Sequence, residues 1–231
     1  MRSFSLVVFF VYCSVSLGKP WPVLRLLKTL SFFDQLPNPL SLFRGKSSTG
    51  VATVMSRSNI LFSQSEGVWL EFGALDDVVM GGVSQTSNSP GAGSGVFSGV
   101  VSTDNNGGFA GVRTKLFDPP RDISASTGFQ LKVAGDGNRY KFIIRDDAQW
   151  NGVAWSSSFD TSKGKSVTVK LPIASFKPTR FAKTVVGGPG FNKSNFCGLQ
   201  FTLSKFEYDG GLNQAFTAGA FNLELQEISL Y

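Results

Sequence analysis

The feature that most restricts how this chain can fold is a two-residue alternation of apolar side chains, repeated in short runs from Ile60 onward. Successive side chains of a β-strand point to opposite faces, so each such run gives a strand one apolar face. Glycine, asparagine, aspartate and proline separate the runs, and no stretch after residue 60 has a sustained helical period. Many short strands at this spacing predict an all-β antiparallel sandwich or barrel. The clearest runs are Val68, Leu70 and Phe72; Ala110, Val112, Thr114 and Leu116; Phe129, Leu131 and Val133; Tyr140, Phe142 and Ile144; Val167, Val169 and Leu171; and Cys197, Leu199, Phe201 and Leu203.

The final run changes phase. Alternation over Phe221, Leu223 and Leu225 is followed by a shifted pair, Ile228 and Leu230. A one-residue shift within a strand is what a β-bulge produces, so we predict a bulge there. The chain has 231 residues, 42% of them hydrophobic, and 22 phenylalanines, which suffices for one core. We therefore expect a single β-sandwich domain at residues 60–231.

The net charge of +6 is confined to the first part of the chain. Residues 1–65 hold seven basic residues and a single acid, Asp34, which leaves 15 basic and 15 acidic residues from position 66 onward. A neutral body lacks the basic surface with which proteins bind phosphate backbones. The composition therefore predicts no nucleic-acid partner.

The chain contains no histidine, and its two cysteines are Cys13 and Cys197. These facts exclude Ser-His-Asp and Cys-His catalysis, histidine metal ligands and a cysteine zinc site. Cys197 alternates with apolar neighbours and is expected to be an inert core thiol. No glycine-rich nucleotide motif has the required spacing. We expect no cofactor and no metal.

Paired carboxylates occur at Asp76–Asp77 and Asp146–Asp147. Neighbours in a strand point to opposite faces, whereas a glycosidase needs two carboxyl groups facing one sugar. Turn and capping roles are therefore favoured for these acids, and the protein is expected not to be an enzyme. An acid-dependent hydrolase is the disfavoured alternative.

Residues 1–18 have one arginine, an apolar run and small residues near Gly18, the layout of a secretory signal peptide. Residues 19–59 are rich in serine and basic residues, as transit peptides are. Within them, Val23, Leu26, Leu27, Leu30 and Phe33 recur at helical spacing. A signal peptide followed by a transit-like segment resembles leaders of algae with secondary plastids. We favour a plastid, then a mitochondrion, then secretion, and expect no membrane span in the mature chain.

Two glycine-containing stretches predict a polar rim. DDVVMGGVSQ is expected to end a strand at Val78–Met80 and then turn tightly, and DNNGGF offers a second turn. If both turns lie at one end of the sandwich, they form a recognition surface. The alternative is that the residues only hold the turns together. The candidate residues are Asp77, Met80, Gly81, Gly82, Ser84, Asn105, Asn106, Gly107, Gly108 and Arg113.

Aromatic residues supply an alternative site. Tyr140, Trp150 and Trp155 could form a platform on which a sugar ring stacks. The competing interpretation is that they pack in the core or shield a sheet edge.

Four ordered motifs resemble the complex I intermediate-associated protein 30 family. They are DDVVMGGVSQ (76–85), VSTDNNGGFAGVR (101–113), the run from GDGNRYKF (135–142) to VTVKLPIASFKPTR (167–180), and the ending AGAFNLELQEISLY. The resemblance implies an antiparallel jelly-roll β-sandwich similar to galactose-binding domains. It also implies a non-enzymatic assembly factor, chaperone-like, whose partners are protein subunits of respiratory complex I (NADH dehydrogenase). A photosynthetic membrane complex takes that place if the protein enters a plastid. The alternative function is a carbohydrate-binding module on the same fold.

Overall fold

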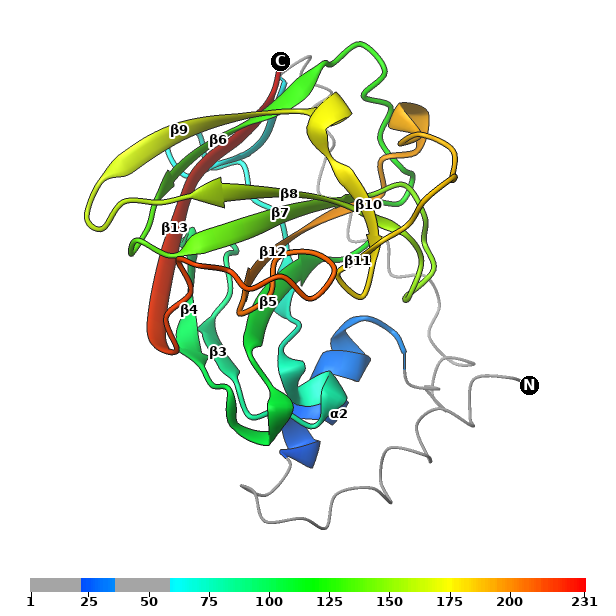
Figure 1. Ribbon diagram of the computed structural model, residues 1–231. Coiled ribbons are helices and arrows are strands. Elements are labelled where there is room, and N and C mark those ends of the chain that lie inside the picture. The colour runs from blue at the N-terminus through cyan, green and yellow to red at the C-terminus, as the bar shows by residue number, and fades with distance from the viewer. Residues whose placement is uncertain (1–21, 36–58) are drawn as a thin grey trace, which may run out of the picture.

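The computed structural model describes residues 22–35 and 59–231. Strands of the body form two antiparallel sheets that pack face to face (Figure 1). The six-stranded sheet has the order β3 (Gln85–Asn88), β4 (Val96–Val101), β13 (Gly219–Leu230), β6 (Gly128–Ala134) and β9 (Ser166–Pro172), with β1 (Ile60–Ser63) also paired to β13. The seven-stranded sheet has the order β11 (Lys183–Thr184), β10 (Lys177–Arg180), β8 (Ala154–Asp160), β7 (Arg139–Arg145), β12 (Gly198–Ser204), β5 (Phe109–Thr114) and β2 (Phe72–Ala74).

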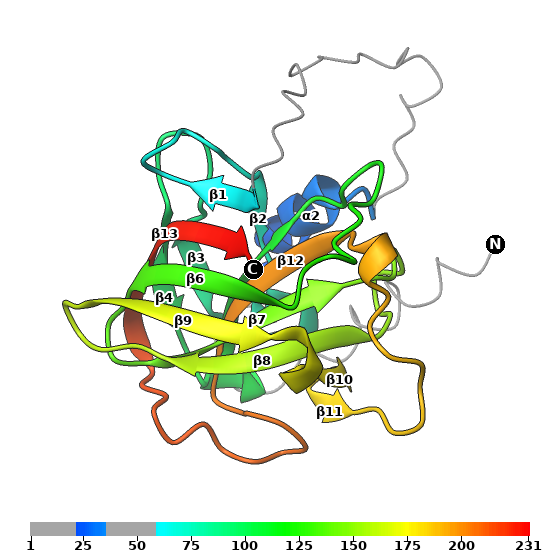
Figure 2. The ribbon, with the colours of Figure 1, turned by 90° about the horizontal axis from the view of Figure 1, so that it is seen from above.

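Strands that pair in space are mostly distant in sequence. The long strand β13 pairs with β4 along its first half and with β1 along its second half, while β6 lies on its other side (Figure 2). The register between β13 and β6 shifts between Leu225 and Glu227, so the predicted bulge is confirmed. These pairings make an antiparallel jelly-roll β-sandwich, and the predicted fold class is confirmed.

The core lies between the two sheets and is largely aromatic. Phe97 of β4 and Phe129 of β6 are fully buried and meet Tyr140 and Phe142 of β7 across the interface. These are edge-to-face contacts, the arrangement that aromatic rings favour. Cys197 is buried as well, and burial raises the pKa of its thiol, which fits an inert core residue.

Helical structure is short in the described residues. The helix α2 (Val23–Phe32) confirms the helical spacing seen in the sequence. The others are single 3₁₀ turns: η2 (Asp77–Met80), η3 (Asp104–Asn106), η4 (Ile173–Ser175) and η5 (Lys193–Asn195). The expectation that Val78–Met80 end a strand is therefore wrong. These residues turn, because Asp77 points inward to collect main-chain donors.

No helix in residues 22–35 and 59–231 is long and apolar enough to cross a membrane. The predicted signal peptide at residues 1–18 lies outside the described residues, as do residues 19–21 and 36–58 of the transit-like segment.

Candidate functional site

The two glycine-containing stretches meet at the buried side chain of Asp77. Its Oδ1 accepts a hydrogen bond from the main-chain N–H of Ser84 at 2.9 Å. Its Oδ2 accepts from the Ser84 hydroxyl at 2.6 Å and from the main-chain N–H groups of Gly108 at 2.8 Å and Phe109 at 3.3 Å. Hydrogen bonds to an ionised group are stronger than neutral ones. The carboxylate thus joins residues 76–85 to residues 101–113.

Glycine is required on both sides of this carboxylate. A Cβ at Gly82 would lie 2.3 Å from the Asp77 Cγ, and one at Gly107 would lie 2.4 Å from its Oδ2. Gly81 ends η2 with φ of 90°, a left-handed conformation that L-residues rarely adopt. The glycines therefore let two backbones approach one buried side chain.

Asp76 points to the opposite side and makes a second, separate set of bonds. Its carboxylate accepts from the main-chain N–H and the hydroxyl of Thr86 and from the main-chain N–H of Gly111. Burial raises the pKa of Asp76 despite these donors. In the described part of the chain no lysine or arginine forms an ion pair with Asp76 or Asp77. Main-chain dipoles therefore stabilise both charges.

Only part of the predicted rim faces solvent. The Met80 side chain is 64% exposed, and Asn105 and Asn106 are exposed with φ of 55° and 58°. The Asn105 amide donates to the Gly81 carbonyl at 3.3 Å, which brings the two turns together as predicted. Asp77, Gly82, Ser84, Gly107 and Gly108 are buried beneath them.

Arg113 lies away from the rim, and the expectation that it belongs there is wrong. It is four residues along β5 from Phe109, a distance of about 13 Å in a strand. Its Nε donates to the Gln200 Oε1 at 2.9 Å, and its guanidinium lies 4.8 Å from the centre of the Trp150 ring. Burial, and then the charge of Arg145, lowers the pKa of Arg113.

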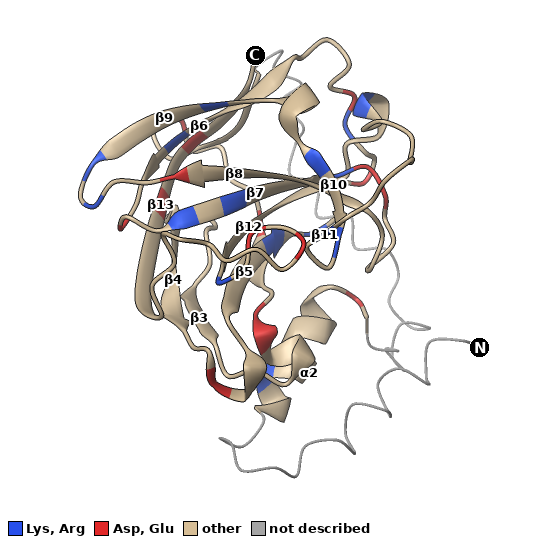
Figure 3. Cartoon of the chain, viewed as in Figure 1, with Lys and Arg blue, Asp and Glu red and all other residues tan. Residues whose placement is uncertain are grey.

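Helix α2 packs beside the rim and over Arg113, which the sequence did not predict. Arg25 donates to the main-chain carbonyls of Ser84 at 2.6 Å and Val83 at 3.3 Å. Figure 3 shows this helix next to the acidic turn η2. At its other end the Phe33 ring contacts Trp150, with centroids 5.3 Å apart. Helical spacing predicted α2 itself, but nothing in that spacing indicated where it docks.

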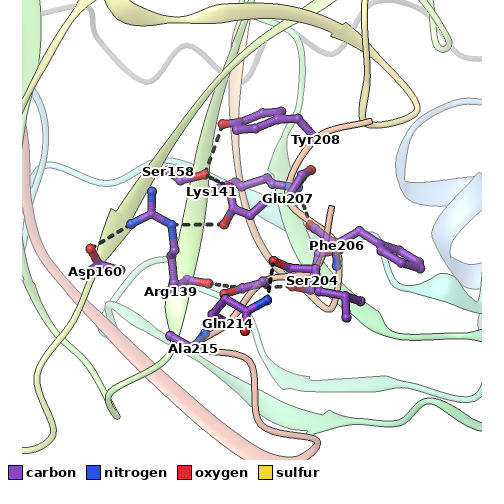
Figure 4. A network of polar contacts seen from close by, with 12 residues as sticks. Arg139, Lys141, Ser158, Asp160, Ser204, Phe206, Glu207, Tyr208, Gln214 and Ala215 are labelled. Carbon is purple, nitrogen blue, oxygen red and sulfur yellow. Dashed lines mark hydrogen bonds and ion pairs between the residues drawn. The ribbon is translucent and has the colours of Figure 1, made fainter. Parts of the chain in front are cut away.

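A second polar cluster holds the segment between β12 and β13 against the seven-stranded sheet (Figure 4). The buried Lys141 Nζ donates to the main-chain carbonyls of Phe206, at 2.6 Å, and Glu207. Arg139 pairs with Asp160 at 2.7 Å and with Glu207 at 3.1 Å. Burial, opposed by Glu207, lowers the pKa of Lys141 to about 8.

The aromatic residues proposed as a sugar platform do not share a surface. Tyr140 is fully buried in the core and donates from its hydroxyl to Asp136 at 3.0 Å, so its part in a platform is wrong. Trp155 packs against the core and against Phe191 and donates to Asp146. Trp150 contacts Phe33 instead.

Titratable ligands for a metal are not gathered anywhere in the described residues, where no three His, Cys, Asp or Glu side chains are placed to hold an ion. The adjacent acids Asp76 and Asp77 point to different sides and accept from main-chain donors. Their arrangement supports a structural role for these carboxylates.

The family model of complex I intermediate-associated protein 30 matches residues 60–225, which include both turns, Asp77 and the core strands. The chain belongs to this family. Membership links it to the assembly of complex I, and the family is one of assembly factors. Helix α2 lies before the matched region.

One further relative and several solved structures are similar to this chain. An uncharacterized protein of Schizosaccharomyces pombe is 29% identical over 165 residues, which cover 64% of this chain and 75% of the relative. The family 11 carbohydrate-binding module of a Clostridium thermocellum cellulosomal cellulase has a TM-score of 0.40 and 18% identity, over 69% of this chain and 94% of the module. An agarase, AgWH50C, has a TM-score of 0.46 and 10% identity, over 74% of this chain and 24% of the agarase.

Proposed function

We propose that this protein is a non-enzymatic, chaperone-like assembly factor that binds partly built intermediates of respiratory complex I. Family membership over residues 60–225 carries the proposal. A fold alone would not, since sandwiches of this kind serve unrelated functions.

The use of the carboxylates supports a non-catalytic role. Asp77 accepts four hydrogen bonds in a buried position, and Asp76 accepts three. General acid–base catalysis needs a carboxyl group that can reach the substrate proton. Groups whose lone pairs are already occupied by main-chain donors are poorly suited to that task.

Partner contact is assigned to the exposed part of the rim. Met80 is a large, flexible apolar side chain that is 64% exposed, and the facing turn exposes Asn105 and Asn106, of which Asn105 donates to the carbonyl of Gly81 next to Met80. Methionine adapts to irregular apolar surfaces, and amides add directional hydrogen bonds. The buried residues below keep this surface in place.

The compartment is a separate proposal that rests on the leader. A signal peptide at residues 1–18 followed by a transit-like segment at 19–59 directs the protein to a plastid, where a photosynthetic membrane complex replaces complex I as the client. Mitochondrial delivery is the second choice and secretion the third. A fusion of residues 1–59 to a fluorescent protein tests the compartment directly, and labelling of mitochondria would overturn the plastid assignment.

The function is tested with the tagged full chain, isolated from gently solubilised organelle membranes and resolved on a native gel. Co-migration with complex I subunits is the expected result for a mitochondrial protein, and co-migration with thylakoid subunits for a plastid one. Met80→Ser should weaken the association, with the exposed Val186→Ser as a matched control on another part of the surface. Migration near the mass of the single chain, with retention on glycan beads, would overturn the proposal in favour of carbohydrate binding.

A further inference from the structure

The surface beneath helix α2 has the features of a receptor for a helix. We call it the helix-docking face and define it by Gly73 of β2, the main-chain carbonyls of Val83 and Ser84, Arg113 of β5, Lys115 directly after β5, and Trp150. All of these residues lie in the region that matches the family model, whereas the helix lies outside it. The helix-docking face is therefore part of the family domain, whereas α2, which covers it, is not.

Gly73 is the part of the face that is shaped for an aromatic side chain. A Cβ at this position would lie 2.2 Å from the Cδ1 of Phe32, so the ring occupies the space that any side chain would fill. Gly73 sits on β2, the edge strand of the seven-stranded sheet. The Lys115 ammonium lies 5.0 Å from the centre of the same ring, which adds a cation–π contact.

A site for a cation lies at the opposite end of the helix from this aromatic site. The carbonyls of Ser84 and Val83 both accept from Arg25, at 2.6 and 3.3 Å. Because both acceptors are main-chain carbonyls, this site selects a positively charged side chain at that position of the helix and makes no further demand on its type. At the other end, Phe33 is 5.3 Å from Trp150 and 5.8 Å from the Arg113 guanidinium.

The docked stripe of α2 follows helical spacing. Arg25, the buried Thr29, and Phe32 stand at positions i, i+4 and i+7, the residues that share one face of a helix. The outward face carries Leu24, which is 83% exposed. The helix has ten residues and no side-chain cap at its N-terminus. Isolated helices of this length are marginal in water, so docking and helix formation are coupled.

We propose that the helix-docking face receives an amphipathic helix of a partner protein, and that α2 is an internal substitute that occupies it beforehand. The partner helix carries a basic residue, a small residue four positions later, and aromatic residues at the seventh and eighth positions after the basic one. That the partner is a subunit under assembly rests on the proposed function; the recognition chemistry does not.

Occupation of the face by α2 weakens the binding of a partner helix. Because α2 belongs to the same chain as the face, its docking is intramolecular and takes place at an effective concentration on the order of millimolar. A partner helix must compete with that concentration, so the full chain is expected to bind it weakly. Removal of the transit-like segment would take α2 away and uncover the face for the partner.

The test uses the full chain and a fluorescein-labelled peptide of residues 20–36 as probe, followed by fluorescence anisotropy. The chain with Arg25→Ser and Phe32→Ser releases its own helix and should bind the peptide at least about tenfold more tightly than the unaltered chain. Adding Gly73→Leu fills the aromatic position and should abolish that binding. Adding Gly91→Ala instead, where a Cβ meets nothing within 4 Å, should leave it unchanged.

A second measurement guards against variants that fail to fold. A protease site inserted in residues 36–58 of the otherwise unaltered chain allows the helix to be cut free after folding, and the labelled peptide should then exchange into the face. No binding to either the released or the cut chain, or equal binding with Gly73→Leu, would overturn the proposal. If the peptide does not bind while complex subunits still co-purify, the proposal for the helix-docking face is wrong and the proposed function stands. If the peptide binds but no complex subunits co-purify, only the proposed function is overturned.

Discussion

Two segments of this protein are held against the sandwich by buried charges of opposite sign. At the rim, the Asp77 carboxylate is surrounded by main-chain N–H groups and one hydroxyl. On the seven-stranded sheet, the Lys141 ammonium is surrounded by main-chain carbonyls from the segment after β12. In both places the direct hydrogen-bond partners of the ion are mainly main-chain groups, and neither ion depends on one opposite charge.

The difference lies in how completely each charge is enclosed. Gly82 and Gly107 approach Asp77 so closely that a Cβ on either would collide with the carboxylate. Lys141 has a carboxylate nearby as well, Glu207, and the segment above it reaches solvent at Phe206, which is 38% exposed. The rim is therefore expected to tolerate change less than the segment over Lys141.

The largest effect is expected for Asp77→Asn. The new amide N–H₂ would face main-chain donors at Gly108 or Ser84, which leaves buried groups unpaired and should cost about 3–4 kcal/mol of unfolding free energy. Asp76→Asn is the matched control and should cost less, because Asp76 accepts two main-chain N–H bonds where Asp77 accepts three, and burial already disfavours the charged form of Asp76. Urea unfolding of both variants gives the two values. An equal loss in the two would show that Asp77 has no special place in the rim.

Gly82→Ala should come next. Its Cβ would stand 2.3 Å from the Asp77 Cγ, so the carboxylate must move away from its donors, at a cost of about 2–3 kcal/mol. Gly91→Ala, in open space, is the control and should change stability by less than about 0.5 kcal/mol. Thermal unfolding compares the two variants, and a Gly82→Ala protein as stable as the control would contradict the close approach.

Lys141→Met tests the cationic side. At pH 7 we expect a loss of about 1 kcal/mol, because two carbonyls lose their donor while the cost of a buried charge disappears. The pKa of Lys141 is lowered to about 8, below its value in the unfolded chain. Between that pKa and the unfolded pKa, the unfolded state binds more protons, so stability rises with pH.

The pH dependence sharpens this prediction. From pH 7 to 10.5 the unaltered chain should gain up to about 3 kcal/mol relative to Lys141→Met, at 1.36 kcal/mol for each unit of pKa. Denaturant unfolding at several pH values measures the difference between the two proteins. A difference that stays constant with pH would mean that the pKa of Lys141 is the same in the folded and the unfolded chain.

Asp160→Asn should have the smallest effect. Asp160 pairs with Arg139 at 2.7 Å, but its side chain is 71% exposed, and exposed ion pairs contribute about 0–1 kcal/mol. We expect a loss below about 0.5 kcal/mol that vanishes in high salt. Thermal unfolding at low and high salt measures it, and a loss above 1 kcal/mol would place this pair among the groups that hold the segment in position.

Local pattern was sufficient for much of the fold. Alternation from Phe129 to Val133 and from Tyr140 to Ile144 predicted strands whose apolar faces do meet in the core. The phase shift after Leu225 predicted the bulge. Local pattern failed at Val78–Met80, where three apolar residues suggested a strand end. There the inward turn of Asp77 toward donors 31 residues away in sequence decides the conformation.

The candidate site shows the same limit. The stretch DDVVMGGVSQ indicates a turn held by its own polar residues, and the Asp77 carboxylate does accept from the main-chain N–H and the hydroxyl of Ser84. The expectation that Arg113 lies near the rim shows where the short motif stops being informative. In fact β5 carries it away to Gln200 and Trp150, since an extended strand moves about 3.3 Å per residue.

The sequence by itself determined the all-β class, the bulge, the helical spacing between Val23 and Phe33, and the family of this protein. Those properties depend on side-chain period and on short ordered motifs, which are local. Only the tertiary structure decided that one carboxylate joins the two turns, that Tyr140 is core, and that α2 covers Gly73 and Arg113. The bond that joins the two turns and the contacts of α2 with the sheet connect residues 31 or more positions apart. A local period carries no information about which distant groups a buried side chain will meet.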